Sequence, residues 1–177
     1  INNLIYTDSH PPGYQTLLYY WMLLFGQSDF MVRLPSVVAG IAAVAAVYRL
    51  GRVFLSPVTG LLAAAILAVS YNAIYYSQEA RAYIFLMLFA TLHYHVFLQL
   101  FLRKEQKTSH WVSFWILGVL LAYFHYVGVV IVLSEAAVML FLISSGDRRS
   151  QFFKAFVPIF LLYVPWLPVL YRHLFFD

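Results

Sequence analysis

Long apolar runs separated by short polar segments make up most of this chain. Six runs approach the length of about 20 helical residues that crosses the hydrocarbon core of a bilayer. They cover residues 34–54, 57–76, 82–102, 111–125, 127–144 and 152–171. The fourth and fifth runs adjoin at residues 124–128, where we predict a tight turn, because one helix over both would overshoot the bilayer. The pattern predicts an all-α, polytopic membrane bundle of about six transmembrane helices.

The segment before the first run has a different character. Residues 13–26 read GYQTLLYYWMLLFG, which is apolar but too short to span comfortably and carries Tyr, Trp and Gln throughout. Such segments lie along the membrane interface, where aromatic side chains are favoured. We therefore predict the end of an extracytoplasmic loop at 1–12, a juxtamembrane helix at 13–30 and a single transmembrane bundle at 31–177. We expect this bundle to be truncated at both ends.

Composition agrees with a membrane protein. Hydrophobic residues form 63% of the chain and charged residues 10%, whereas soluble domains are about one half apolar and one quarter charged. The net charge is +4, but the basic residues are spread between apolar runs and do not form one patch. Membrane lipids are thus the predicted surroundings, and nucleic acid is not a predicted partner.

The distribution of Lys and Arg predicts the orientation. Cytoplasmic loops of membrane proteins are enriched in these residues. Three alternate hairpins contain eight of the eleven, namely Arg49, Arg52, Arg103, Lys104, Lys107, Arg148, Arg149 and Lys154. The opposite side has only Arg33, Arg81 and Arg172. We therefore place the 8–12 segment, the 77–81 turn and the His125 turn on the extracytoplasmic face.

Ionisable residues from separate loops would meet on that face. The carboxylates Asp8 and Glu79 suit general-base activation of a hydroxyl, or a divalent cation such as Mg²⁺, Mn²⁺ or Ca²⁺ held through oxygen. His10, Arg33 and Arg81 suit phosphate binding. Carboxylates and phosphate binders at a lipid boundary fit a lipid-linked phosphate substrate.

Structural roles are alternatives for the same residues. Asp8 equally suits a helix N-cap before Pro11 and Pro12. Arg33 and Arg81 also suit interfacial anchors that extend toward lipid headgroups. Glu79 and Arg81 are two positions apart and would point in different directions on a helix, so we expect each to have its own partner.

Several segments together resemble a known family. They are DSHPPGY (8–14), WMLLFGQSDFMVRLPSVVAG (21–40), YRLGRVF (48–54) and YYSQEARAY (75–83). In this order and spacing they resemble the dolichyl-phosphate-mannose protein mannosyltransferase-like proteins, which are GT-C-type integral membrane glycosyltransferases and include lipid A aminoarabinose transferases. The resemblance covers roughly residues 7–172.

The resemblance implies an enzyme that moves a hexosyl or pentosyl group from a polyprenyl-phosphate donor to a protein or lipid acceptor. It implies a multi-pass protein of the cell membrane, bacterial or archaeal, with an extracytoplasmic active face. It also implies that the principal acid lies before Ile1. Many relatives have an aspartate where Tyr83 stands here, so Tyr83 is an accessory candidate. His125 is another, because the charge pattern places its turn on the same face. The alternative is a non-catalytic membrane subunit or scaffold of the same ancestry.

Overall fold

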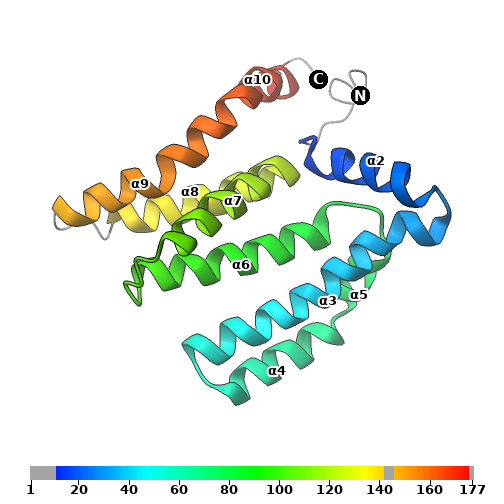
Figure 1. The fold of residues 1–177 in the computed structure, drawn as a ribbon, viewed down its shortest axis with the longest axis horizontal. Helices are drawn as coiled ribbons and strands as arrows, with labels where there is room; N and C mark the ends of the chain where they lie inside the picture. Colours follow the sequence, from blue (N-terminus) through cyan, green and yellow to red (C-terminus); the bar gives the residue numbers. More distant parts are fainter. Residues whose placement is uncertain (1–10, 142–145, 176–177) are drawn as a thin grey trace. The chain divides into compact units, whose positions relative to one another are not determined.

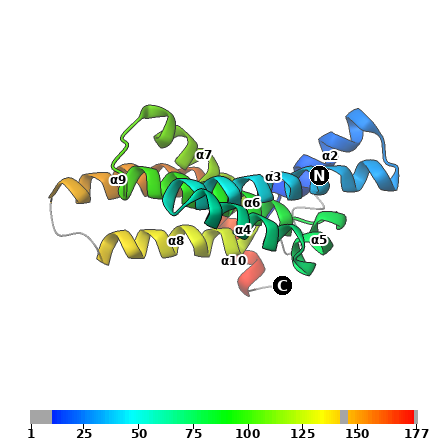
Figure 2. The same cartoon turned by 90° about the horizontal axis from the view of Figure 1, so that it is seen from below.

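The computed structural model describes residues 11–141 and 146–175, and all regular structure within those ranges is helical (Figures 1 and 2). In chain order the elements are α2 (Gly13–Phe25), α3 (Asp29–Phe54), α4 (Pro57–Ala68), α5 (Tyr71–Gln78), α6 (Tyr83–Phe101), α7 (Thr108–Phe124), α8 (Tyr126–Phe141), α9 (Gly146–Tyr163), the 3₁₀ turn η1 (Val164–Trp166) and α10 (Leu167–Phe175). The predicted all-α class is confirmed.

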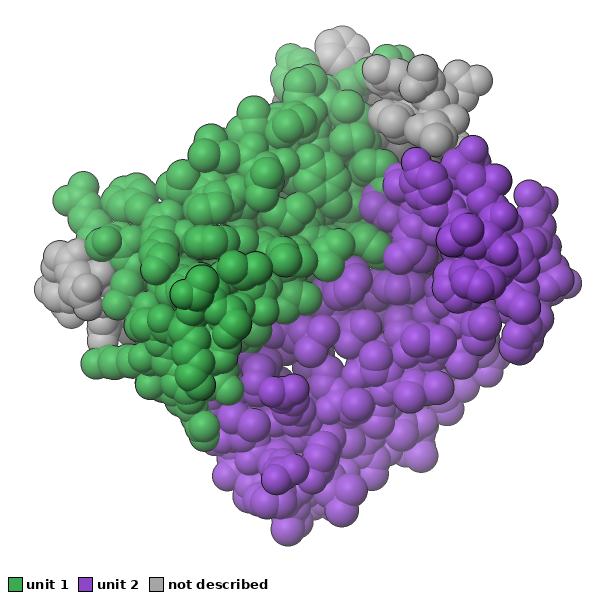
Figure 3. Space-filling view, viewed as in Figure 1, with its two compact units in different colours: residues 1–12, 96–177 green, residues 13–95 purple. Residues whose placement is uncertain are grey.

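The chain forms two units with separate packing (Figure 3). One unit consists of residues 13–95 and contains α2 to α5 and most of α6. The other consists of residues 1–12 and 96–177 and contains the end of α6 and α7 to α10. We refer to them as the N-terminal-helix unit and the C-terminal-helix unit.

Three stretches of the described residues are long and apolar enough to cross a membrane: Asp29–Phe54, Tyr83–Phe101 and Arg149–Arg172. They correspond to the predicted runs at 34–54, 82–102 and 152–171. The predicted turn at 124–128 is also present, because α7 ends at Phe124 and α8 begins at Tyr126. With 17 and 16 residues, α7 and α8 are shorter apolar helices, so the count of six spans is approximate.

The run at 57–76, which we predicted as one transmembrane helix, is a bent pair of helices. Helices α4 and α5 meet at an angle of 58°, and the pair counts as one broken span or as a re-entrant loop. The break falls at Val69 and Ser70, and Ser70 has the extended backbone of a residue that precedes a helix. Serine favours helix boundaries over helix interiors, and this local preference outweighs the continuous hydropathy.

Helices α3 and α4 of the N-terminal-helix unit form a hairpin whose two backbones touch. A Cβ on Gly51 would lie 2.6 Å from the Cα of Gly60, and a Cβ on Gly60 would lie 2.6 Å from the carbonyl oxygen of Tyr48. Ser56 begins α4 by accepting a hydrogen bond from the Thr59 amide at 3.1 Å. Small residues allow such close approach of membrane helices, where packing replaces the hydrophobic effect as the driving force.

In the C-terminal-helix unit, α7 and α9 run parallel and α8 runs between their ends in the opposite direction. Two hydrogen bonds, each between residues 39 positions apart, hold α7 and α9 in alignment. The Trp115 indole donates to the Lys154 carbonyl at 3.0 Å, and the Tyr123 hydroxyl donates to the Leu162 carbonyl at 2.9 Å. Phe114 is fully buried, and its ring packs against that of Phe156 at 5.7 Å between centroids.

Candidate functional site

The candidate site is centred on the turn between α5 and α6, at residues 79–82. Glu79 has an extended backbone directly after the last residue of α5. Its carboxylate lies 3.7 Å from the Nε atom of Arg81, and both side chains are exposed, at 36% and 66%. Our expectation of separate partners for these two residues is therefore wrong. They do not lie on a helix, and the bend of the turn brings the two side chains to the same side.

Aromatic and small residues hold this turn on the N-terminal-helix unit. The ring of Tyr83 packs on that of Tyr76, with centroids 4.8 Å apart, so the residues on either side of the turn are joined. Ser77 donates a hydrogen bond to the Ala73 carbonyl at 2.6 Å and lies directly against Gly40 of α3. A Cβ at position 40 would collide with the Ser77 hydroxyl and lie 3.1 Å from its Cβ. The end of α5, directly before the turn, thus packs closely on α3, and any side chain at position 40 would require Ser77 to move.

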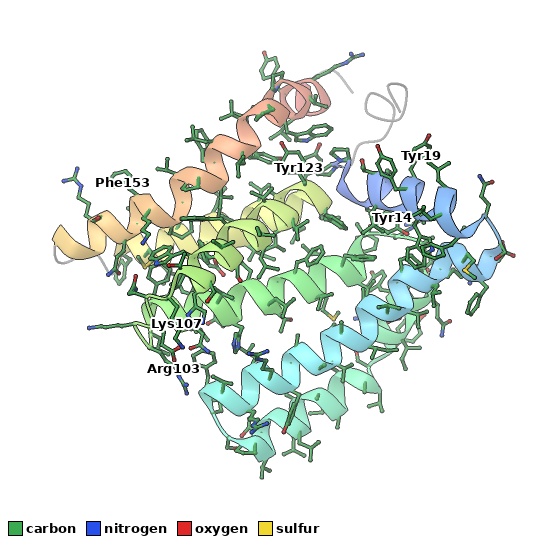
Figure 4. The ribbon with its side chains drawn as sticks, viewed as in Figure 1. Tyr14, Tyr19, Arg103, Lys107, Tyr123 and Phe153 are labelled. Atoms are coloured by element: carbon green, nitrogen blue, oxygen red, sulfur yellow. The ribbon has the colours of Figure 1, made fainter. Side chains whose placement is uncertain are left out.

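The start of α2 is attached to the same region through Tyr14. This side chain is only 5% exposed, in contrast to Tyr19 on the same helix at 39% (Figure 4). Its ring lies 5.7 Å from that of Phe85 at the start of α6. Burial raises the pKa of the Tyr14 hydroxyl, and the neighbouring hydroxyl of the fully buried Ser36 opposes this rise. Tyr14 therefore stays protonated and able to donate a hydrogen bond at neutral pH.

The supporting residues Tyr14, Ser36, Gly40 and Ser77 come from three of the four sequence segments that carry the family resemblance. These segments therefore pack against one another in space. Sequence reasoning assigned no role to these residues, because it looked for groups with acid–base or charge chemistry. The only sign of their importance in the sequence was that they lie within the segments that resemble the family.

Arg33 lies on the first part of α3, and its side chain is exposed. Among the described residues it has no ion pair. Its guanidinium is therefore accessible, as either a phosphate-binding or an interfacial role requires.

Two candidate residues, Asp8 and His10, lie outside the described residues. The predicted carboxylate pair of Asp8 and Glu79 therefore stays a prediction, as does a divalent cation held by it. Among the side chains that the structure describes, no group of three His, Asp or Glu could hold a metal ion.

His125 belongs to the C-terminal-helix unit and has a structural contact. It lies between α7 and α8, and its Nδ1 atom accepts a hydrogen bond from the Val127 amide at 3.1 Å. The imidazole thus caps the first turn of α8, as Asn or Asp usually does. Its accessory role in the site stays a prediction.

Because of this cap, we expect His125→Ala to destabilise α8 by about 1 kcal/mol and His125→Asn to restore most of the loss. Thermal unfolding of the purified protein in detergent would measure both variants. Equal losses for Ala and Asn would show that the cap contributes little and that His125 acts in another way.

An all-helical chain with several membrane-spanning helices, and with motif residues gathered around one polar turn, belongs to the class of multi-pass membrane proteins. The sequence model of the dolichyl-phosphate-mannose-protein mannosyltransferase family matches residues 9–174. The chain therefore belongs to this family, and it is a membrane glycosyltransferase by family. No curated protein and no solved structure shows significant similarity to the chain.

Proposed function

We propose that this protein transfers a sugar from a polyprenyl-phosphate donor to a protein or lipid acceptor at the extracytoplasmic face. The observation that supports this most strongly is the Glu79–Arg81 pair, a carboxylate beside a guanidinium on an exposed turn anchored by three family motifs. In this proposal Glu79 assists activation of the acceptor hydroxyl, together with Asp8. His10, Arg33 and Arg81 bind the donor phosphate.

The geometry of the pair suits an exchange of partners during donor binding. At 3.7 Å and with both groups exposed, the ion pair contributes at most about 1 kcal/mol. A phosphate accepts two parallel hydrogen bonds from a guanidinium and binds it more strongly than this long contact does. Donor binding would therefore draw Arg81 from Glu79 at little cost. The freed carboxylate can then accept a proton from the acceptor.

The orientation of the charges supports the extracytoplasmic face. The charge rule predicts that the basic residues of the α6–α7 loop, Arg103, Lys104 and Lys107, are cytoplasmic. Arg103 and Lys107 are labelled in Figure 4, close to the end of α6. The α5–α6 turn is at the other end of α6, a candidate span of 19 residues. A polyprenyl-phosphate sugar presented in the outer leaflet would therefore have its phosphate at the level of Arg81.

The test is sugar transfer by the purified protein in proteoliposomes. We expect transfer from a polyprenyl-phosphate sugar and none from the matching nucleotide sugar. Asp8→Asn should lower the rate, and unglycosylated polyprenyl phosphate should compete with the donor. Transfer from the nucleotide sugar alone would contradict the proposed donor. A protein that binds the lipid-linked sugar but never transfers it would support the non-catalytic subunit instead.

A further inference from the structure

A second feature of the molecule lies in the C-terminal-helix unit, on residues to which no role in sugar transfer is assigned. Helices α7, α8 and α9 enclose an apolar groove of about 290 Å³. Its walls include Val132, Leu133 and Ala136 from α8 and Phe153, Phe156 and Phe160 from α9. This volume is at the lower end of the range for ligand sites, about 300–1,000 Å³, and suits part of one hydrocarbon chain.

The groove is open to its surroundings. Leu133, Phe153 and Phe160 are 62%, 50% and 60% exposed, although they line it. Most of α9 belongs to the candidate span Arg149–Arg172, so its open side chains Phe153 and Phe160 would lie in the hydrocarbon region. Lipid chains therefore have direct access to the groove from the membrane.

A cation lies on the groove side of α9, near the end where this helix begins. Arg149 precedes Phe152 and Phe153 by three and four residues, a spacing that places side chains on one face of a helix. Its guanidinium carbon is 6.0 Å from the centre of the Phe153 ring, which lines the groove. Arg149 is exposed and forms no ion pair with any described residue.

Other fixed positive charge lies at the same end of this unit. The ammonium group of Lys154 sits 4.2 Å from the centre of the Trp111 ring. The α6–α7 loop adds Arg103, Lys104 and Lys107 and one carboxylate, Glu105, which pairs with Lys107 at 3.2 Å. Lys and Arg near a membrane surface attract anionic lipids. The charge rule predicts that this end is cytoplasmic and that the α5–α6 turn is extracytoplasmic.

We propose that this groove binds an anionic glycerophospholipid of the cytoplasmic leaflet. One acyl chain lies between α8 and α9, and the headgroup phosphate contacts Arg149. We choose this lipid because it has both groups that the site can bind, an apolar chain for the groove and a negative charge for the exposed Arg149 at its predicted cytoplasmic end. A polyprenyl phosphate at the transfer site would have its phosphate at the opposite face.

The test compares lipid binding by the purified protein in detergent, using native mass spectrometry with phosphatidylglycerol and phosphatidylcholine. We expect phosphatidylglycerol to be preferred. Arg149→Gln should reduce its affinity about fivefold, since one basic residue near a membrane surface accounts for about that factor. The affinity for phosphatidylcholine should fall less, because its choline cation already balances the charge of its phosphate. Arg52→Gln is the matched control, because it removes one exposed arginine from the other unit on the same predicted face.

A second variant tests the groove itself. Ala136→Phe should fill the groove and displace phosphatidylglycerol, while the melting temperature of the protein stays near that of the wild type. Equal phosphatidylglycerol affinity in Arg149→Gln and the wild type would overturn the proposal. So would Ala136→Phe displacing polyprenyl phosphate but not phosphatidylglycerol, because the groove would then hold the donor chain. Neither result depends on transfer activity, so the proposed function is tested separately.

Discussion

Replacing Glu79 with Gln should lower the rate of sugar transfer by about 10²–10⁴-fold, the range typical of a positioned acid–base group. Gln has the shape of Glu, so the α5–α6 turn and its Tyr76–Tyr83 contact should remain intact. The amide cannot accept the proton of the acceptor hydroxyl, and it cannot carry negative charge. We therefore expect the loss in kcat at saturating donor, measured with the purified protein in proteoliposomes.

Two comparisons make this result specific. Glu105→Gln is the matched control, since it converts a partly exposed carboxylate, paired with Lys107 in the α6–α7 loop, without touching the transfer site. It should transfer at the wild-type rate. Arg81→Gln should mainly raise the KM for the donor, because it removes a phosphate partner. Wild-type transfer by Glu79→Gln would remove Glu79 from the site and leave the family membership unaffected.

Hydropathy predicted the helices well where no residue inside an apolar run interrupted the helix. The run at 34–54 lies within the observed α3, and the turn after Phe124 is where a polar His interrupts two apolar runs. The break at Val69 and Ser70 was missed, because hydropathy averages over about 20 residues. A single serine changes that average little, yet it changes the local backbone preference.

The residues of the candidate site were chosen by their chemistry, and their roles stay predictions. Charge reasoning selected Glu79 and Arg81 correctly as neighbours on one turn, but a helical geometry was assumed and their pairing was missed. The contact of Gly40 with Ser77 joins two segments nearly forty residues apart in the sequence. Such a contact depends on how α3 and α5 cross, and no local pattern encodes that crossing.

The contact between Gly51 and Gly60 leads to the largest expected effect on stability. Any side chain at position 60 must occupy space held by backbone, since its Cβ would lie 2.6 Å from the Tyr48 carbonyl oxygen and 2.7 Å from the Arg52 amide nitrogen. Backbone atoms cannot rotate away as a side chain can, so the two helices must separate. We expect Gly60→Val to destabilise the protein by at least about 1–3 kcal/mol, the usual cost of overpacking.

Thermal unfolding in detergent and protease sensitivity of the α3–α4 hairpin would measure this loss. Ala65→Val is the control on the same helix, because Ala65 is exposed and a larger side chain there meets no backbone. Gly60→Ala should give an intermediate loss, since even one methyl group cannot fit between the helices. If Gly60→Val and Ala65→Val were equally stable, the close approach of α3 and α4 would not hold the hairpin. Its stability would then have to come from contacts farther along the two helices, such as those of the buried Ala43 and Ala64.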